Sequence, residues 1–513
     1  MSRTKRFLDG LTLGYVNQFL LTVVGLWLTP FLLRRVGQHD YGLWLVGAQL
    51  LAYLSLMDFG IVALLPRATA YATGRAGSVS DAKDLPEIVG HAAWVVLFQT
   101  PLVAVVALVL WFTIPVAWGP LRTPIAIVML AFVLAFPLRI FAAVLQGLQD
   151  LAFLGKVNIM AWLAGTALTI ALVLVGRGLY ALAYGWVLTQ VLTAGVCYVR
   201  LRRTFAGVLP HTLPSVSWLQ FRGQLKQGFW ISVAQVAQIL TNGTDLVIVG
   251  LILGPLAVVP YVCTAKLINV LANQPQMLMH GAGPALSEMK MAESRQRLFQ
   301  VCTALSQAML LVSGAVACVV LTVNRGFVNW WVGAGQYGGL LLSALLLLVM
   351  LLRHWNTTVV YAIFCFGYER RISATTLLDG VVTVGAAFLF VRLFGLVGAP
   401  VGSLLGVCAV SLPGNLPALA RENGVGPITI LKTLWPWFYR FVLLAAAALL
   451  VAKVFVPQNV LAIAATALLS AGVYGVVMLP LVFREPLGTY VRPRISAAGM
   501  RFRRVVFVRD ANV

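Results

Sequence analysis

Long apolar runs are the feature of this sequence that most restricts how the chain can fold. A helix crosses the hydrocarbon core of a membrane in about 20 apolar residues. Windows of that length recur throughout the 513 residues, at 12–33, 42–65, 89–112, 124–145, 157–176, 179–199, 229–253, 256–282, 299–323, 339–366, 374–394, 396–419, 437–456 and 459–483. The runs predict an all-α polytopic membrane protein of about fourteen transmembrane helices. The weakest window, 374–394, is short and has Asp379 near one end, so twelve or thirteen spans stay open.

The charges support this class and suggest an orientation. Only 10% of the residues are charged, against about 25% in an ordinary soluble domain. The chain has 37 Lys and Arg against 15 Asp and Glu, an excess that we assign to an anionic membrane face rather than to nucleic acid. With the N-terminus in the cytoplasm, the cytoplasmic segments carry about four times as many Lys and Arg as the outer loops, as the positive-inside rule requires. We therefore expect both termini in the cytoplasm.

The two halves of the sequence share a weak repeat. A glycine closes one span and an aromatic residue seven positions later opens the next, at Gly37 and Trp44 and again at Gly254 and Tyr261. Duplicated bundles with a substrate path between them are common among secondary transporters. We expect two pseudo-symmetric six-helix bundles at 1–215 and 216–420, two additional transmembrane helices at 421–483, and a basic cytoplasmic tail at 484–513.

Ionisable side chains inside a span are costly, so they usually face a cavity or a partner. Six stand out here: Asp58, Arg67, Arg139, Asp245, Lys266 and Arg353. Their depths suit two pairs, Asp245 with Lys266 and Asp58 with Arg139, which would be either structural ion pairs or ion-coupling sites. The four cations outnumber the acids, and a cationic cavity suits a phosphate or diphosphate. For Arg67, a side chain extending to the cytoplasmic surface is the slightly favoured alternative.

Catalysis is not indicated. The histidines and cysteines show no metal-ligand spacing, so we expect the six cysteines to be packing residues and assign no catalytic residue, metal or cofactor. The outer loops are too short to hold the active site of a membrane enzyme. Transport is therefore favoured over an enzymatic function.

Several short motifs resemble a known family. Gly37 to Gly60 reads G-x3-Y-G-L-W and ends L-M-D-F-G, residues 145–149 read L-Q-G-L-Q, and Thr244-Asp245 is followed by Leu253-Gly254 and Tyr261. These stretches resemble the lipid-linked-oligosaccharide flippases of polysaccharide biosynthesis, in the multidrug/oligosaccharidyl-lipid/polysaccharide superfamily. Fourteen spans in a six, six and two layout fit that family as well.

The resemblance implies a flippase in the bacterial cytoplasmic (inner) membrane. It would move an undecaprenyl-diphosphate-linked oligosaccharide to the outer leaflet by alternating access, for surface polysaccharide or exopolysaccharide. By position, Arg139, Lys266 and Arg353 would contact the diphosphate in a central cavity. Membrane lipids are expected partners, and a polysaccharide polymerase and export proteins are compatible with the resemblance.

Three alternatives remain open at this point, and one of them is a structural scaffold that recruits polysaccharide enzymes through its basic cytoplasmic loops. A multidrug antiporter of the same superfamily would transport organic cations and should favour acidic cavity residues, which the excess of Arg and Lys opposes. A membrane-embedded polysaccharide-assembly enzyme would need a larger outer loop with paired carboxylates. The glycan, the coupling ion and the oligomeric state are not specified by the sequence.

Overall fold

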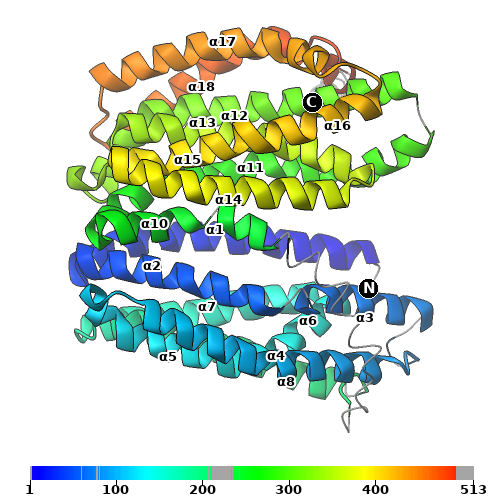
Figure 1. The fold of residues 1–513 in the computed structure, drawn as a ribbon, viewed down its shortest axis with the longest axis vertical. Coiled ribbons are helices and arrows are strands. Elements are labelled where there is room, and N and C mark those ends of the chain that lie inside the picture. Colours follow the sequence, from blue (N-terminus) through cyan, green and yellow to red (C-terminus); the bar gives the residue numbers. More distant parts are fainter. Residues whose placement is uncertain are drawn as a thin grey trace, which may run out of the picture. The chain divides into compact units, whose positions relative to one another are not determined.

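The computed structural model describes residues 3–58, 61–76, 79, 81–205, 207–210, 233, 235–241, 243–292 and 294–492. Helices and their short connections make up these residues, and no strand occurs among them. The all-α class predicted from the apolar runs is confirmed. The helices group into two compact units, Met1–Val259 and Pro260–Val513, which are described separately below and can be followed by colour in Figure 1.

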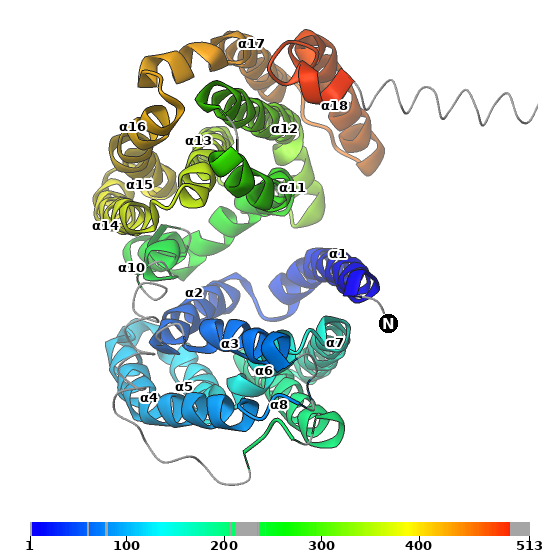
Figure 2. The same ribbon diagram turned by 90° about the vertical axis from the view of Figure 1, so that its right-hand side faces the viewer.

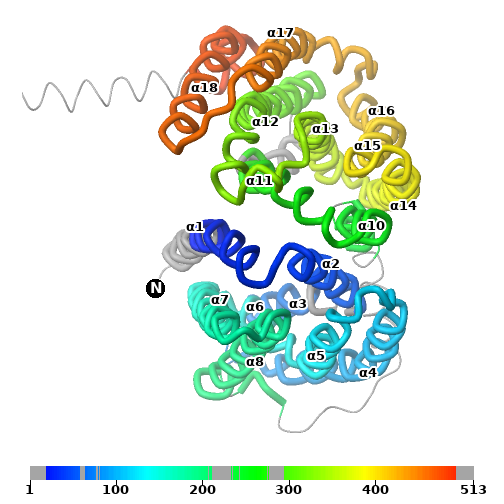
Figure 3. Tube along the Cα trace, turned by 90° about the vertical axis from the view of Figure 1, so that its left-hand side faces the viewer, coloured from blue at the N-terminus to red at the C-terminus, as the bar shows by residue number. Residues whose placement is uncertain are grey.

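Unit 1 contains helices that pack both against neighbours along the chain and against helices distant in sequence. Among its pairs in contact are α7 with α8, α3 with α6, and α5 with α8, and Figure 3 shows α7 and α8 next to each other. The bounds are α1 Arg3–Arg35, α2 Gln38–Ser55, η1 Leu56–Asp58, α3 Ile61–Ala76, α4 Leu85–Thr113, η2 Val116–Trp118, α5 Gly119–Ala135, η3 Phe136–Leu138, α6 Arg139–Gly147, α7 Leu151–Leu174, α8 Leu179–Thr204 and α10 Thr244–Leu253.

Unit 2 is built around α12. This helix contacts α13, α16, α17 and α18, and Figure 2 looks nearly along these helices. In the most apolar window of α12, 56% is buried, against 6% in α18, which therefore lies at the lipid-facing edge. The bounds are α11 Pro255–Ala292, which begins in unit 1, α12 Arg295–Trp331, η4 Ala334–Gln336, α13 Leu340–Cys365, α14 Glu369–Phe394, η5 Gly395–Val397, α15 Gly398–Gly406, the π-helix η6 Val407–Ser411, α16 Leu412–Asn423, α17 Pro427–Val454 and α18 Val460–Val482.

Ten stretches of the described residues are long and apolar enough to cross a membrane, or eleven if the bent segment Gln235–Leu253 counts as one. One of the ten, Glu369–Asn423, contains two of the predicted spans, because the chain reverses at η5 and α15 returns along α14 (Figure 1). The protein is thus a multi-pass membrane protein. The exact number of spans stays a prediction.

The predicted boundary between the two bundles, at residue 215/216, lies outside the described residues. Further along the chain, α10 packs against α2 of unit 1. A Cβ atom added to Gly250 of α10 would lie 2.7 Å from Cγ2 of Val46 in α2. The start of α11 is also close to α2, because a Cβ atom added to Gly42 would lie 2.1 Å from the carbonyl oxygen of Pro255. The division into four segments that the sequence suggests remains a prediction.

Small residues allow the closest helix pair of unit 2 to form. A Cβ atom added to Gly398 would lie 2.1 Å from the backbone of Phe390, and one added to Gly402 would lie 2.4 Å from the backbone nitrogen of Ala387. Only glycine lets α15 approach the backbone of α14 this closely. In membranes, where lipid is as apolar as a helix surface, such close backbone packing is a principal source of helix association.

The six cysteines are free thiols. Four are buried, Cys365 is half-buried, and Cys408 is exposed on the surface of η6. The expectation that all six are packing residues is therefore wrong for Cys408. The π-helical segment turns this side chain outward, which the apolar character of the stretch does not reveal.

Candidate functional site

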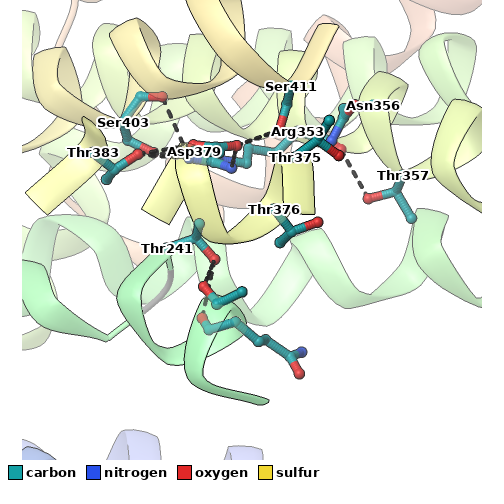
Figure 4. Close-up of polar contacts among 12 residues, drawn as sticks. Thr241, Arg353, Asn356, Thr357, Thr375, Thr376, Asp379, Thr383, Ser403 and Ser411 are labelled. Atoms are coloured by element: carbon teal, nitrogen blue, oxygen red, sulfur yellow. Dashed lines mark hydrogen bonds and ion pairs between the residues drawn. The ribbon is translucent and has the colours of Figure 1, made fainter. Parts of the chain in front are cut away.

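Arg353 of α13 forms a buried ion pair with Asp379 of α14. Its Nη1 donates to Oδ2 at 2.6 Å, and its Nη2 donates to Oδ1 at 3.1 Å. The Asp379 side chain is completely buried, and that of Arg353 is 18% exposed. Removing either charge from water costs several kcal/mol, so a buried pair needs this kind of two-point geometry to be tolerated. The pair fixes α13 against α14 (Figure 4).

Hydroxyl groups complete the environment of this pair. Thr383, one turn along α14, donates to Oδ1 of Asp379 at 3.0 Å, and Ser411 donates to Oδ2. Nη2 of Arg353 also donates to Oγ of Ser403 at 3.0 Å. Each carboxylate oxygen therefore accepts from two donors, and four elements (α13, α14, α15 and η6) contribute to one polar centre (Figure 4).

Local backbone features create the space for the carboxylate. A Cβ atom on Gly406 would lie 2.3 Å from Oδ1 of Asp379 and 2.2 Å from Oγ1 of Thr383, so only glycine fits there. Directly after Gly406 the chain adopts a π-helix that ends at Ser411. π-Helical turns are rare and occur frequently at functional sites. Here the turn coincides with the residue that donates to Asp379.

Asp379 is not among the six ionisable residues that the sequence analysis singles out inside spans. The predicted span 374–394 has Asp379 near one end, but α14 begins at Glu369. Asp379 is therefore ten residues into the helix, about 15 Å along its axis. Two signals pointed to it: Thr383 four residues later on the same helix face, and the glycines spaced four apart in the following segment.

His354, the neighbour of Arg353, faces another direction. Its Nδ1 lies 2.7 Å from Oγ of Ser313 on α12, and the side chain is buried. The contact belongs to a series of buried polar pairs between α12 and α13, which also includes Ser306 with Thr358 and Asn324 with Ser343. Such pairs supply interhelical hydrogen bonds in a membrane.

Lys266 of α11 is half-buried and follows three buried residues, Cys263, Thr264 and Ala265. Among the side chains described in unit 2, no carboxylate lies within ion-pair distance of its ammonium group. Lys266 thus differs from Arg353, whose charge is offset by Asp379. The predicted pair of Lys266 with Asp245 joins residues of different units and stays a prediction.

Arg139 is the first residue of α6 and directly follows a 3-10 turn within the fourth predicted span. The helix α5 ends at Ala135, and η3 with Pro137 precedes Arg139. The Arg139 guanidinium lies 5.9 Å from the ring centre of Phe132 and 5.7 Å from that of Phe136. These are cation–π contacts, which hold a guanidinium without cancelling its charge.

Arg67 of α3 is exposed. Its Nε donates to the hydroxyl of Tyr71 at 2.9 Å, one turn along the helix, and the guanidinium lies 5.2 Å from the Tyr71 ring centre. An exposed arginine held by its own helix fits the surface-reaching alternative as well as a substrate contact. The assignment of Arg67 to the cation site stays a prediction.

The two acidic candidates lie in unit 1. Asp58 is the last residue of η1, and its side chain lies outside the described residues. Asp245 is in the first turn of α10, directly after a 44° bend between Gln235–Thr241 and Thr244–Leu253. An acidic residue in a first turn is favoured by the helix dipole, and broken spans of this kind often surround ion sites in transporters.

The structure therefore brings only one predicted cation into a defined polar centre. Arg67 and Arg139 belong to unit 1, whereas Lys266 and Arg353 belong to unit 2. A cavity that all four share stays a prediction. No group of three or more His, Cys, Asp or Glu side chains suited to a metal ion occurs in the described part of the chain.

Comparisons with known proteins agree with this architecture. A family model described as "Polysaccharide biosynthesis protein" matches residues 50–334. No curated protein sequence matches the chain. Among solved structures, one described as lipid II flippase MurJ in an inward closed conformation has a TM-score of 0.62 and 10% identity, with 91% of this chain and 99% of that chain covered.

Two further structures are similar at lower scores. They are described as inward-facing and outward-facing conformations of a multidrug resistance MATE family transporter of the MOP superfamily, with TM-scores of 0.53 and 0.51 and 14% identity each. They cover 77% and 82% of this chain, and 93% and 94% of theirs. At these identities the likeness shows a shared transporter fold.

Proposed function

The chain belongs to the polysaccharide biosynthesis protein family, and we propose that it flips an undecaprenyl-diphosphate-linked oligosaccharide across the bacterial inner membrane. The movement would run from the cytoplasmic to the outer leaflet by alternating access of the two units. The family match and the MurJ-like fold support a flippase or transporter. The substrate, the membrane and the cytoplasmic position of both termini are parts of the proposal.

The environment of Lys266 is the observation that most supports a diphosphate-linked substrate. A half-buried ammonium in a span, with no carboxylate partner among the described side chains of unit 2, is a charge available to an anion. A diphosphate cannot enter hydrocarbon unaided, because burying an unpaired charge costs many kcal/mol. Cationic groups along a hydrated path would replace the water and counterions that the diphosphate loses.

The remaining cations would act differently. Arg139, whose guanidinium lies against the rings of Phe132 and Phe136, is proposed as a second contact for the same anion. Arg353 would reach a diphosphate only after its bonds to Asp379 open, so we assign first contact to Lys266 and Arg139. Arg67 would contact the substrate from the exposed surface of α3. Asp58 and Asp245 are proposed as ion-coupling or structural groups.

The test is complementation of a bacterial strain that lacks this protein. Lys266→Gln and Arg139→Gln keep the size and polarity of each side chain while removing its charge. We expect surface polysaccharide to fall at least tenfold in either variant, since each lost charge–phosphate contact is worth about 1.5–3 kcal/mol. Membrane levels of each variant are measured by immunoblot.

Lys453→Gln is the matched control, because it removes the same charge from an exposed side chain in the last turn of α17. It should support polysaccharide at the unmodified level. Full polysaccharide in both Lys266→Gln and Arg139→Gln would reject the cationic path.

A multidrug antiporter is the second candidate, and the likeness to MATE transporters favours it. It would export organic cations, which an uncompensated lysine repels. Cells that express the protein would then accumulate less of a cationic dye. We expect dye accumulation to be the same with and without the protein.

A further inference from the structure

A cleft lies between α12, α17 and the chain that follows α18. One part, of about 220 Å³, is lined by Gln307, Lys432, Thr433, Trp437 and Arg484, among others. A second part, of about 200 Å³, shares Thr433, Glu485 and Pro486 with the first and extends to Tyr490. Two adjoining parts of this size have room for a polar headgroup.

The cleft lies at headgroup depth. Lys432 and Thr433 are in the second turn of α17, and Arg484 lies two residues after the end of α18. Gln307 is twelve residues after the start of α12. Trp435 and Tyr439, on the same part of α17, are 61% and 42% exposed. Exposed Trp and Tyr rings of this kind mark the boundary between hydrocarbon and headgroups.

The charges on its rim are unbalanced. Lys432 and Arg484 are exposed, and neither forms an ion pair with a carboxylate of the described residues. Glu485 is also on the rim, so the two cations exceed the acid by one charge. Arg492 donates to the carbonyl oxygen of Phe483 nearby. Two unpaired cations beside a cleft favour an anion such as a phosphodiester.

Gln307 adds a second requirement for the molecule that occupies the cleft, a hydrogen-bond donor. Its Nε2 donates to the carbonyl oxygen of Thr433 at 3.3 Å, while its buried Oε1 accepts no hydrogen bond from the described residues. A buried acceptor without a donor costs about 1–3 kcal/mol. A hydroxyl group of the occupant would supply that donor, and Glu485 could accept from another.

We propose that this cleft binds the headgroup of an anionic phospholipid with free hydroxyls, of the phosphatidylglycerol class. The phosphate contacts Lys432 and Arg484, the glycerol hydroxyls donate to Gln307 and Glu485, and the acyl chains lie along α17 and α18. The bound lipid ties the last two helices to α12 on the side that the charge pattern assigns to the cytoplasm. The site is independent of the proposed transport substrate.

Native mass spectrometry of the purified full-length protein, titrated with phosphatidylglycerol, tests the site. We expect the double variant Lys432→Gln/Arg484→Gln to bind about 30-fold more weakly, since each basic residue near a lipid surface contributes roughly 1 kcal/mol. The matched control is Arg392→Gln/Lys453→Gln, which removes the same charge from the last turns of α14 and α17 and should bind as the unmodified protein does. Equal binding by the two double variants overturns the proposal.

Further binding experiments distinguish a phospholipid from other compounds that carry a phosphate. Gln307→Leu should lose the preference for phosphatidylglycerol over phosphatidic acid, which lacks the glycerol headgroup, and a retained preference overturns the role of Gln307. Inorganic phosphate and undecaprenyl phosphate should not displace the lipid at equal concentration. Displacement by either shows a general anion site or a substrate site and overturns the phospholipid assignment. Lys432→Arg keeps the charge, should bind normally, and serves as the folding control.

Discussion

At the scale of single residues, Asp379 shows how a carboxylate is accommodated in a membrane helix. Its two oxygens accept from Arg353, Thr383 and Ser411, so the charge is offset where it is buried. Lys266 is the opposite case, a half-buried cation without a carboxylate among the described side chains of its unit. The first arrangement offsets a buried charge within the fold, whereas we propose that the second binds an anion.

Breaking the Arg353–Asp379 pair from one side should destabilise the protein strongly. Arg353→Met or Asp379→Leu leaves one buried charge without its partner, at a cost of about 3–5 kcal/mol. The double variant Arg353→Met/Asp379→Leu removes both charges and should recover most of that loss. The loss of stability and its recovery are measured as shifts in the midpoint temperature of thermal unfolding in detergent. A double variant no more stable than the single variants would show that the pair does not act as a unit.

At the scale of elements, glycines decide which helices approach closely. The α14–α15 pair depends on Gly398, Gly402 and Gly406, and in unit 1 the α7–α8 pair uses Gly165 and Gly185 in the same way. A Cβ on Gly165 would lie 2.0 Å from Oγ1 of Thr189, and one on Gly185 would lie 1.9 Å from Oγ1 of Thr169. The two pairs share their packing, but only α14–α15 contains a buried carboxylate among the described residues.

Gly402→Ala should therefore lower the free energy of unfolding by about 1–3 kcal/mol, the usual cost of overpacking a tight interface. Its new methyl group would meet the backbone of Ala387. Gly385→Ala, on α14, is the control, since no atom lies within 4 Å of a Cβ at that position. This control should be neutral or slightly stabilising, because alanine favours helix more than glycine does. Equal effects of both changes on chemical unfolding would contradict the packing argument.

The sequence is sufficient to predict the class of fold, but it is not sufficient to predict the polar centre of Arg353 and Asp379. Runs of apolar residues predict membrane helices directly, because the hydrocarbon thickness fixes their length. Asp379 was missed as a partner because the start of α14 carries Glu369, Arg370 and Arg371, and an apolar window therefore begins too late. The π-helix at 407–411 has no sequence signature, since it depends on tertiary packing around the carboxylate.

At the scale of the whole molecule, two helical units carry different chemistry. Unit 1 has a 3-10 turn at Pro137, a bent segment before Asp245, and a cation, Arg139, that lies against aromatic rings. Unit 2 has an ion-paired centre and a lysine without a carboxylate partner among the side chains described in that unit. Transporters of duplicated bundles move one bundle against the other around a fixed site. The ion-paired centre of unit 2 fits a helix bundle that moves as a rigid body.

The central claim is that this chain translocates a lipid-linked diphosphate. The most direct measurement is flipping of a fluorescent undecaprenyl-diphosphate-linked oligosaccharide in proteoliposomes, read from the fraction accessible to a quencher outside. The fraction accessible to the quencher should rise at the same initial rate with the unmodified protein and with Lys453→Gln. With Lys266→Gln, the initial rate should be at least tenfold lower. A rate for Lys266→Gln equal to that of the unmodified protein, or no flipping by any of the three, would contradict the account.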